Sequence, residues 1–358
     1  MSTDCFVTPH KKSITLTIRS RQILRKVPHL LMAFALVFFI QGCVRQPENQ
    51  PLANENPQPV ADPLPSWNDG AVKHSITAFV TQATDSSSKG FIPITERIAT
   101  FDNDGTLWAE RPIVQELFAT ARLKSMLEKD KSLAQKQPFK AAATGDKSYF
   151  EKGGAKAAIE LLLATHTGMT EEEFHQDVVD FFANTKYPNR NTSLRGIRYQ
   201  PQLELLEYLR ANGFKVYICT GGTIEFVRAI SKDYYGIPEE QVIGSSFKYA
   251  FLDSSRKIMR KPELDRFNDQ AEKPASIQLH IGKPPVLACG NEGGHGDIAM
   301  LKFSQTSRFP TLQLLVNHDD GEREYAYSEK DSASVSTARA NKWQVISIKN
   351  DWKKVFAN

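Results

Sequence analysis

The stretch Arg97-Ile-Ala-Thr-Phe-Asp-Asn-Asp-Gly-Thr-Leu-Trp108 decides the expected fold. Residues 98–101 are a short apolar run of strand-forming residues, which predicts a buried strand. This strand ends directly on Asp102 and Asp104, so two carboxylates stand where a strand gives way to a loop. In an open α/β sheet, ligands bind at that carboxyl end of the strands. The two acids repel each other, so we expect a cation, a proton or a positive side chain beside them.

A solvated Asp-Asn-Asp-Gly turn is the plainest alternative for this stretch. That alternative does not explain why an apolar strand runs straight into the acids. A calcium loop is a second alternative, but three alternating oxygen donors should precede its glycine and only two precede Gly105. A carboxylate can also act as a covalent nucleophile toward phosphorus. The stretch therefore favours a catalytic or metal-binding role.

The first 42 residues have the pattern of a targeting signal. Six Lys/Arg residues precede the eleven-residue apolar run 30–40, which is too short for a bilayer span of about 20 residues. The small Gly42 directly before Cys43 resembles a bacterial lipoprotein processing site, which would leave Cys43 as a lipid-bearing amino terminus. We therefore expect an exported protein, anchored on the periplasmic side of a bacterial membrane by a lipid on Cys43. Ordinary cleavage without a lipid is the alternative.

The net charge gives no reason to expect nucleic acid as a partner. The whole chain carries +4, and residues 1–42 carry six Lys/Arg and one Asp, which is +5. The remainder therefore carries +4 − 5 = −1, so the basic character belongs to the signal. Cys219 and Cys289 lie in predicted core strands, so we expect two buried free thiols there rather than a disulfide.

The rest of the chain predicts one α/β domain with a helical insertion. Residues 43–65 are rich in Pro, Asn and Gln and predict a flexible tether. Segments 66–108 and 199–358 predict the core, with a helix after Trp67-Asn-Asp-Gly70. Residues 109–198 show helical periodicity and predict a cap that acts as a lid over a small substrate. A helical elaboration without a catalytic duty is the alternative for this block.

Two further predicted strands end in polar or glycine-rich loops. Residues 214–219 predict a strand that ends on Thr220-Gly-Gly222 and leads into a helix, an arrangement that points backbone N–H groups at an anion. Residues 286–289 predict a strand that leads into a glycine-rich loop bearing Asn291, Glu292, His295 and Asp297. Between them, residues 247–260 alternate in a way that predicts a β-hairpin.

The carboxyl-terminal segment predicts further elements at the edge of the sheet. Residues 312–316, 322–327 and 344–348 are assigned to them. His318 and Asp319 follow the first of these and are either pocket residues or ordinary polar loop ends.

Two lysines could supply a positive charge to the two acids. Lys283 lies three residues before the strand that starts at Val286, so it belongs to the amino end of that strand, about 10 Å or more from the opposite edge. Lys273 begins a helix that runs down to the same strand, so it starts at the carboxyl edge. We therefore predict Lys273 as the site lysine, with Lys283 as the competitor.

These pieces resemble, in order, the motifs of the haloacid dehalogenase superfamily. Phe101-Asp-Asn-Asp-Gly-Thr-Leu107 resembles its first motif in the phosphatase branch. Thr220-Gly221 resembles the second motif, Lys273-Pro274 the third, and the loop from Asn291 to Asp297 the fourth, although its spacing is longer than usual. The arrangement from the Trp67 region through Trp352 resembles exported members related to phosphoserine phosphatase. The resemblance implies a Rossmann-like parallel sheet with helices on both faces and a C1-type cap after the first strand.

The resemblance also implies a mechanism and a cofactor. Asp102 would attack phosphorus to form an aspartyl phosphate, and Asp104 would act as general acid and base. Thr220, the Gly221 amide and Lys273 would hold the phosphoryl oxygens. Mg²⁺ would be bound by Asp102, the Asp104 carbonyl and Asp297, assisted by Asn291 or, alternatively, by Glu292. His295 is not expected as a ligand, because Mg²⁺ prefers oxygen donors.

The expected activity is hydrolysis of small phosphate monoesters. Glu110 resembles an acid that faces the substrate in the phosphoserine branch, which would favour an amino-bearing ester; a surface Glu at the start of the cap is the alternative. Two other functions stay open, a phosphotransferase that uses the same intermediate and a non-catalytic lipoprotein with a decayed site.

Overall fold

The computed structural model describes residues 61–188, 190–293 and 295–357. The predicted signal peptide, Cys43 and most of the predicted tether lie outside these residues. Leu64, which the tether prediction included, is fully buried, and the backbone N–H of Ser66 donates to Glu204 Oε2 at 2.9 Å. The packed chain therefore begins before residue 66. Among the described residues, no helix has the length and apolar character needed to cross a membrane.

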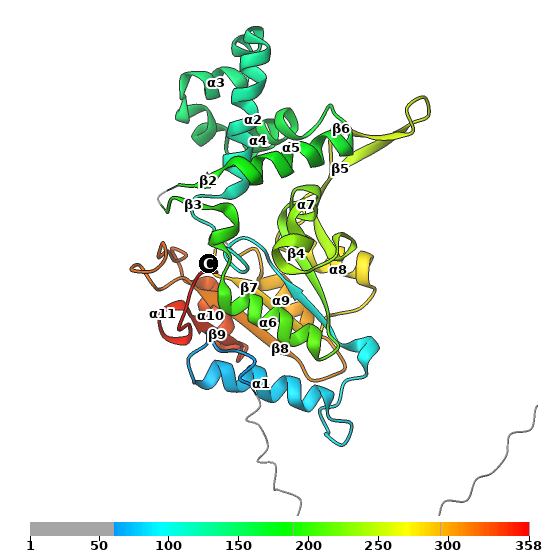
Figure 1. Cartoon of the computed structure of the whole chain (residues 1–358), viewed down its shortest axis with the longest axis vertical. Coiled ribbons are helices and arrows are strands. Elements are labelled where there is room, and N and C mark those ends of the chain that lie inside the picture. Colours follow the sequence, from blue (N-terminus) through cyan, green and yellow to red (C-terminus); the bar gives the residue numbers. More distant parts are fainter. Residues whose placement is uncertain (1–60, 189, 294, 358) are drawn as a thin grey trace, which may run out of the picture. The chain divides into compact units, whose positions relative to one another are not determined.

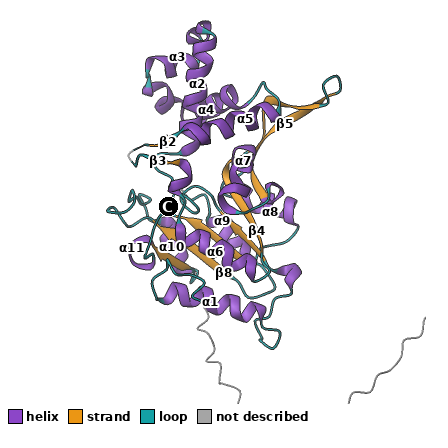
Figure 2. Ribbon diagram, in the orientation of Figure 1, coloured by secondary structure: helices purple, strands orange, loops and turns teal. Residues whose placement is uncertain are grey.

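A seven-stranded, mostly parallel sheet forms the centre of the fold, as the sequence predicts (Figure 2). The strand order is β6-β5-β4-β1-β7-β8-β9, and only the β5–β6 pair is antiparallel. The strands are β1 (Ile98–Phe101), β4 (Lys215–Thr223), β5 (Val242–Leu252), β6 (Lys257–Arg266), β7 (Leu287–Asn291), β8 (Leu312–Asn317) and β9 (Gln344–Ser347). All four residues of β1 are buried, which explains why its sequence is apolar without alternation.

Helices cover both faces of this sheet. Successive side chains of a strand point to opposite faces, so Phe101 packs in one hydrophobic cluster and Ile98 in the other. The first cluster contains residues of α1 (Ala71–Thr84), α6 (Gln200–Ala211) and α7 (Ile224–Tyr235). The second contains residues of α8 (Glu272–Ile281), α9 (Ile298–Ser304) and α10 (Ala333–Ala340). The result is a three-layer α/β core.

The segment between β1 and α6 forms the helical cap (Figure 1). Its elements are α2 (Val114–Lys129), α3 (Phe139–Thr144), α4 (Lys147–His166), α5 (Glu171–Asn184) and the two-residue strands β2 (Lys186–Tyr187) and β3 (Thr192–Ser193). Thr170 and Glu173 form a capping box at the start of α5. Phe118 of α2 packs edge-on against Phe174 and Phe181 of α5, so aromatic side chains join these two helices of the cap.

The β5–β6 hairpin ties the cap to the core. Its strands run farther than the predicted 247–260, and Arg260 lies at their contact with the cap. The Arg260 side chain is buried, donates to the backbone carbonyl of His166 at 2.6 Å and pairs with Glu171 at 2.8 Å. Its guanidinium also lies over the ring of Phe174, 3.9 Å from the centroid. A buried arginine with this many partners fixes the hairpin against α4 and α5.

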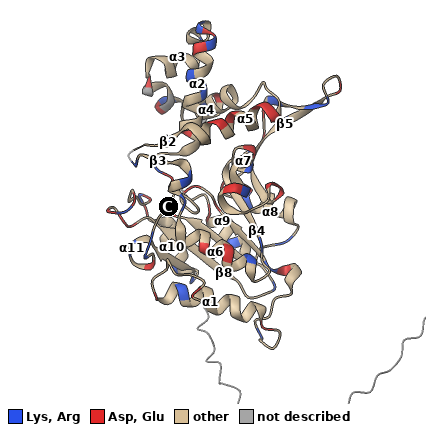
Figure 3. Ribbon diagram, in the orientation of Figure 1, with Lys and Arg blue, Asp and Glu red and all other residues tan. Residues whose placement is uncertain are grey.

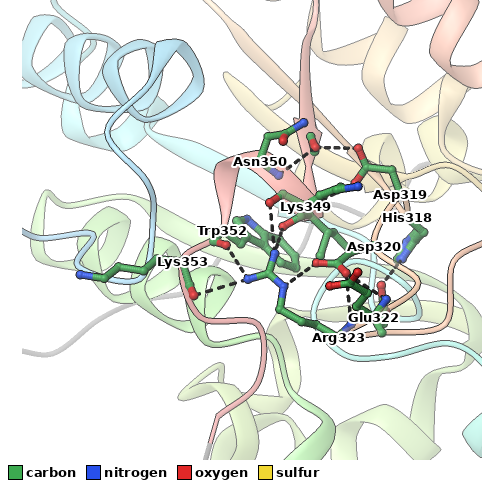
Figure 4. Close-up of polar contacts among 12 residues, drawn as sticks. His318, Asp319, Asp320, Glu322, Arg323, Lys349, Asn350, Trp352 and Lys353 are labelled. Atoms are coloured by element: carbon green, nitrogen blue, oxygen red, sulfur yellow. Dashed lines mark hydrogen bonds and ion pairs between the residues drawn. The ribbon is translucent and has the colours of Figure 1, made fainter.

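The carboxyl-terminal segment differs from the sequence-based prediction. Residues 322–327 form no strand, and α10, which we did not predict, follows them. Arg323 instead holds this loop: its guanidinium donates to the carbonyls of Ile348 and Trp352 at 2.7 and 2.8 Å and pairs with Asp320 (Figure 4). The Asp319 carboxylate accepts from Ser347 Oγ and from the Lys349 N–H (Figure 4). Side-chain bonds therefore order this segment in place of a strand ladder.

Charged residues of both signs are interspersed over the described chain (Figure 3). This distribution agrees with the near-neutral charge calculated for residues 43–358. Cys219 and Cys289 are both buried and free, as predicted.

Candidate active site

Three neighbouring strands bring the predicted site residues to one edge of the sheet. In the parallel register, Phe101 of β1 is aligned with Ile218 of β4 and Cys289 of β7. The residues that follow these positions therefore lie side by side. The Asp102 N–H donates to the Cys289 carbonyl at 2.9 Å, which fixes the start of the first loop against β7. Asp102, Thr220 and Asn291 all line the same cavity.

Lys273 lies between the first and the last of the predicted acids. Its Nζ is 2.6 Å from Asp102 Oδ1 and 2.5 Å from Asp297 Oδ1, and the residue is only 2% exposed. Burial alone would lower the pKa of Lys273, but Asp102 and Asp297 outweigh it and raise that pKa well above its ordinary value. The lysine therefore stays a cation. Burial and Asp297 raise the pKa of Asp102 well above its ordinary value, while Lys273 acts against them.

Lys283, the competing lysine, lies at the other end of β7. Its Nζ donates to the carbonyl of Thr95 at 3.3 Å and pairs with Glu96 Oε1 at 3.1 Å. Thr95 and Glu96 precede β1, so these partners belong to the amino end of the sheet. The structure thus brings Lys273 to the predicted site and does not bring Lys283 there.

Asp104 occupies a different environment from Asp102. The indole Nε1 of Trp108 donates to Asp104 Oδ1 at 2.9 Å, which orients the carboxyl group. Burial raises the pKa of Asp104, although the bonds from Trp108 and Asn103 act in the opposite direction. Gly105 has φ +74°, and a Cβ there would overlap the side-chain amide of Asn291. The glycine is therefore required both for the turn after Asp104 and for the approach of the β7 loop.

Thr220 and Gly221 lie in an extended end of β4 rather than in the predicted turn. The strand continues to Thr223, and its register with β5 shifts between Cys219 and Thr223. The hydroxyl of Thr220 accepts from the Gly222 N–H at 3.0 Å, and its carbonyl accepts from Asn268 Nδ2 at 2.8 Å. This irregular strand end replaces the tight turn, while Thr220 and Gly221 both still line the cavity beside Asp102.

The loop after β7 places one acid at the site and turns another away. Asp297 is buried, and its Oδ2 accepts from the Asn291 N–H at 2.9 Å. A Cβ at Gly290 would overlap the Asp297 carboxylate, so the close approach depends on glycine. Glu292 Oε1 instead accepts from the Glu329 N–H at 2.9 Å, which directs this competitor away from Asp102. His295 is exposed and lies near Glu329 and Asp331.

Glu110 faces the cavity and is held by a residue that sequence reasoning missed. The hydroxyl of Tyr327 donates to Glu110 Oε2 at 2.5 Å and accepts from Asn291 Nδ2 at 3.1 Å. The Tyr327 ring stacks on buried His318, with centroids 4.2 Å apart. Burial raises the pKa of Glu110, and the bond from Tyr327 partly offsets this rise. Glu110 and Tyr327 are 217 positions apart, and no local pattern in the sequence marks the tyrosine.

The donor set at this edge fits a hard divalent cation. Asp102 and Asp297 contact Lys273, and Asp104 lines the same cavity. With these four groups ionised, they carry three negative charges and one positive charge, an excess of two negative charges. Carboxylate and amide oxygens are the ligands that Mg²⁺ prefers. Burial is the main cause of the raised pKa of Asp102, and the negative charge of Asp297 adds to it. The residues present therefore suit Mg²⁺.

Comparison with known proteins identifies the family. A family model described as haloacid dehalogenase-like hydrolase matches residues 99–302, which is more than half of the chain. The chain belongs to this family. Haloacid dehalogenase-like hydrolases share the mostly parallel sheet described above, and the match includes Asp102, Thr220, Lys273 and Asp297. The protein is accordingly a hydrolase of this superfamily.

The chain is also similar to solved structures at low sequence identity. A conserved protein of unknown function from Anaerococcus prevotii is similar with a TM-score of 0.53 and 16% identity, covering 79% of this chain and 94% of its own. A phosphoserine phosphohydrolase-like protein from Francisella tularensis has a TM-score of 0.38 and 20% identity, with 70% and 94% covered. A probable phosphoserine phosphatase from Vibrio cholerae has a TM-score of 0.38 and 14% identity, with 78% and 69% covered. No curated protein matches the sequence.

Proposed function

We propose that this haloacid dehalogenase-like hydrolase is a phosphatase that cleaves phosphate monoesters through a phosphorylated Asp102. The observation that carries the proposal is the different environment of two acids that are two residues apart. Burial raises the pKa of both carboxyl groups, but Asp102 Oδ1 accepts from the ammonium group of Lys273, whereas Asp104 Oδ1 accepts from the neutral indole of Trp108. A nucleophile and a proton donor require this difference.

In the first step, a carboxylate oxygen of Asp102 attacks phosphorus and the bond from phosphorus to the ester oxygen breaks. Asp104 gives its proton to the departing oxygen, which leaves as an alcohol. Lys273, the Thr220 hydroxyl and the Gly221 amide offer donors to the phosphoryl oxygens at the edge where they line the cavity. The product of this step is an acyl phosphate on Asp102.

In the second step, Asp104 takes a proton from water and the resulting nucleophile attacks the phosphorus of the acyl phosphate. The bond to Asp102 breaks, inorganic phosphate leaves, and both carboxyl groups return to their starting states. Asp102, Asp297 and Asn291 would hold Mg²⁺ together with the backbone carbonyl of Asp104, and the bound ion would supply positive charge that offsets the charge of the phosphoryl group. A dehalogenase needs no proton donor for a departing halide, so Asp104 favours phosphate ester cleavage.

Release of phosphate from p-nitrophenyl phosphate by the purified full chain tests this proposal. We expect Mg²⁺-dependent release that is lost with a chelator and restored by Mg²⁺. Asp102→Asn should reduce kcat at least about 10³-fold, because it removes the nucleophile. Asp69→Asn is a matched control, since this aspartate is exposed and lies outside the cavity. Absence of release by the unmodified chain, or equal release by Asp102→Asn, would overturn the proposal.

We also propose that a lipid on Cys43 anchors the protein to the periplasmic face of a bacterial membrane. The support is the sequence pattern of residues 1–43, which lies outside the described residues. Cys43→Ser should move the protein from the membrane fraction to the soluble fraction of expressing cells. Unchanged fractionation of the variant would contradict the lipid anchor.

A further inference from the structure

The cavity at Asp102 is larger than a small phosphate ester requires. Its volume is about 1510 Å³, and it extends from the carboxyl edge of the sheet into the cap. Pockets that enclose drug-sized ligands usually measure about 300 to 1,000 Å³. A phosphorylated amino acid would occupy only the end beside Asp102 and Lys273. The remaining space lies between cap helices, so its lining indicates what else the substrate carries.

Helix α2 sets the direction and length of this space. Gln115, in its first turn, accepts hydrogen bonds through Oε1 from the Thr223 N–H at 3.0 Å and from Thr223 Oγ1 at 3.2 Å. The amino end of α2 is thus fixed to the edge of β4 that carries Thr220. Residues of α2 line the cavity from Gln115 to Leu127. At about 1.5 Å per residue, the cavity follows the helix for roughly 18 Å away from that edge.

The walls of this distal part, which we term the cap groove, are apolar. The groove is lined by Leu123 and Leu127 of α2, Ala142 of α3, and Ile159, Leu161 and Leu162 of α4. Among the described residues, none of these six belongs to either hydrophobic cluster of the molecule. Leu127, Ile159 and Leu162 are half-buried. Apolar side chains that face an open cavity gain free energy when an apolar group displaces the water beside them.

Charged side chains do not give the cap groove a dominant sign. Lys124 and Lys131 line the cavity together with Glu116, Glu128 and Asp146, and these five residues are exposed. Exposed charges at a rim can remain in water while an apolar group occupies the space between the helices. The groove therefore selects for an uncharged occupant, in contrast to the end at Lys273, which selects for a phosphate.

We propose that the substrate is a phosphate monoester of a long, uncharged apolar group. The inference rests on the proposed phosphatase function, because it places the phosphate at Asp102 and the apolar group along α2 in the cap groove. The length of about 18 Å accommodates an alkyl or acyl chain of roughly a dozen carbons.

Hydrolysis of alkyl phosphates from propyl to dodecyl phosphate, below their micelle-forming concentrations, tests the proposal. We expect kcat/KM to rise about threefold per added methylene until the groove is filled. Phosphoserine should lie near the low end of the series. A flat or falling series, with p-nitrophenyl phosphate still hydrolysed, would overturn the proposal and would indicate a lid that closes on small substrates. Absence of hydrolysis of every ester would instead count against the phosphatase function.

Binding measurements separate the groove from the chemistry. The Asp102→Asn chain should bind dodecyl phosphate at least tenfold more tightly than propyl phosphate in calorimetry. Equal affinities would overturn the proposal whether or not the protein is a phosphatase. The same dodecyl phosphate presented in phosphatidylcholine vesicles identifies the source of the chain: tighter binding from vesicles than from solution indicates a membrane source, and the reverse indicates a soluble one.

Variants of the groove provide a second test. Leu162→Asp should lower the ratio of kcat/KM for dodecyl over propyl phosphate at least tenfold, because it places a charge on the wall. Ala142→Phe, which fills the groove without adding a charge, should lower the same ratio. Val179→Asp is the matched control, since Val179 is an exposed apolar residue of cap helix α5 and does not line the cavity. An unchanged ratio in both groove variants, with thermal unfolding like that of the unmodified chain, would overturn the proposal.

Discussion

The two ends of the central sheet use the same residue type in opposite ways. At the carboxyl end, Lys273 is buried and lies within 2.6 Å of Asp102 and Asp297. At the amino end, the Lys283 side chain is 37% exposed and pairs with Glu96 at 3.1 Å. Exposed ion pairs of the second kind contribute about 0 to 1 kcal/mol to stability, because water and salt screen them.

The different burial of Lys273 and Lys283 explains why only the first belongs to the candidate site. Removal from water strengthens the interaction of an ammonium group with nearby carboxylates, and the two acids keep it charged. At the amino end, solvent screens the interaction between the Lys283 ammonium group and the Glu96 carboxylate. Both lysines precede β7 in the chain, but Lys273 begins α8, which places it at the carboxyl edge, whereas Lys283 lies just before β7 at the amino edge. Two predictions test this contrast, and a third concerns another buried acid near the carboxyl end.

The largest effect is expected from Asp104→Asn at the carboxyl end. Loss of the proton donor should reduce kcat/KM about 10²- to 10⁴-fold for alkyl phosphates, whose leaving group needs a proton. The loss should be smaller for p-nitrophenyl phosphate, because p-nitrophenolate leaves without one. Glu96→Gln removes an acid at the amino end and should change neither rate by more than about twofold. Equal losses for both leaving groups would contradict the role of Asp104 as an acid.

The paired variants Lys273→Met and Lys283→Met test the contrast directly. The first should lower kcat about 10²- to 10³-fold, because a donor to the phosphoryl oxygens and the partner of Asp102 are lost. The second should leave kcat within about twofold. Steady-state kinetics with p-nitrophenyl phosphate measures both, and thermal unfolding checks that Lys273→Met is folded. Similar kinetics for the two variants would show that burial between Asp102 and Asp297 does not matter for the reaction.

A smaller effect concerns buried Glu324, which follows β8 near the carboxyl end. Burial raises its pKa to about 8, with Arg190 opposing and Glu110 adding to the rise. Tyr199 OH and His318 Nδ1 contact its carboxyl group. Because the folded chain holds this proton more tightly than the unfolded chain, the stabilisation is present below pH 4.5 and is lost as the pH rises toward 8.

Urea unfolding at several pH values measures this contribution. Glu324→Gln should flatten the fall in unfolding free energy between about pH 5 and 8, relative to the unmodified chain. Burial lowers the pKa of His318 to about 3, so this histidine decreases the free energy of unfolding as the pH falls below 6.5. Above pH 6.5 it adds no such pH dependence, and the change there reports on Glu324. Glu322→Gln, at an exposed neighbouring position, is the control. An unchanged pH dependence in Glu324→Gln would contradict the raised pKa.

Local patterns predicted much of the fold. The apolar run of β1 followed by two acids, the helical periodicity of residues 109–198 and the strand ends at Thr220 and Asn291 all appear in the structure. The same patterns wrongly predicted a sheet-edge element at residues 322–327, which form a loop. In this loop Arg323 donates to backbone carbonyls far along the chain. They also gave a turn where β4 continues to Thr223, because pairing with β5 extends the strand.

The candidate site was predicted only in part. Position at a strand end predicted Asp102, Asp104 and Thr220 at one edge, the start of a helix predicted Lys273 there, and the loop after the next strand supplied Asp297. The structure places all five on the cavity. Loop geometry, which the sequence did not reveal, brings Asn291 to the cavity and turns Glu292 toward the Glu329 backbone. Tyr327 had no local signal, because its contact with Glu110 joins positions that are far apart in the chain.

The sequence by itself determined where the acids of the candidate site lie, since acids after a buried strand must lie at the carboxyl edge of a parallel sheet. Tertiary structure alone decided which groups are buried together, and hence how Lys273 and Asp104 differ from a surface lysine and a surface acid. It also decided the cap groove, because α2, α3 and α4 assemble its walls from residues that look like ordinary core positions in the sequence. The sequence shows which side chains are apolar, but only the packing of the helices shows which of them line the cavity instead of the core.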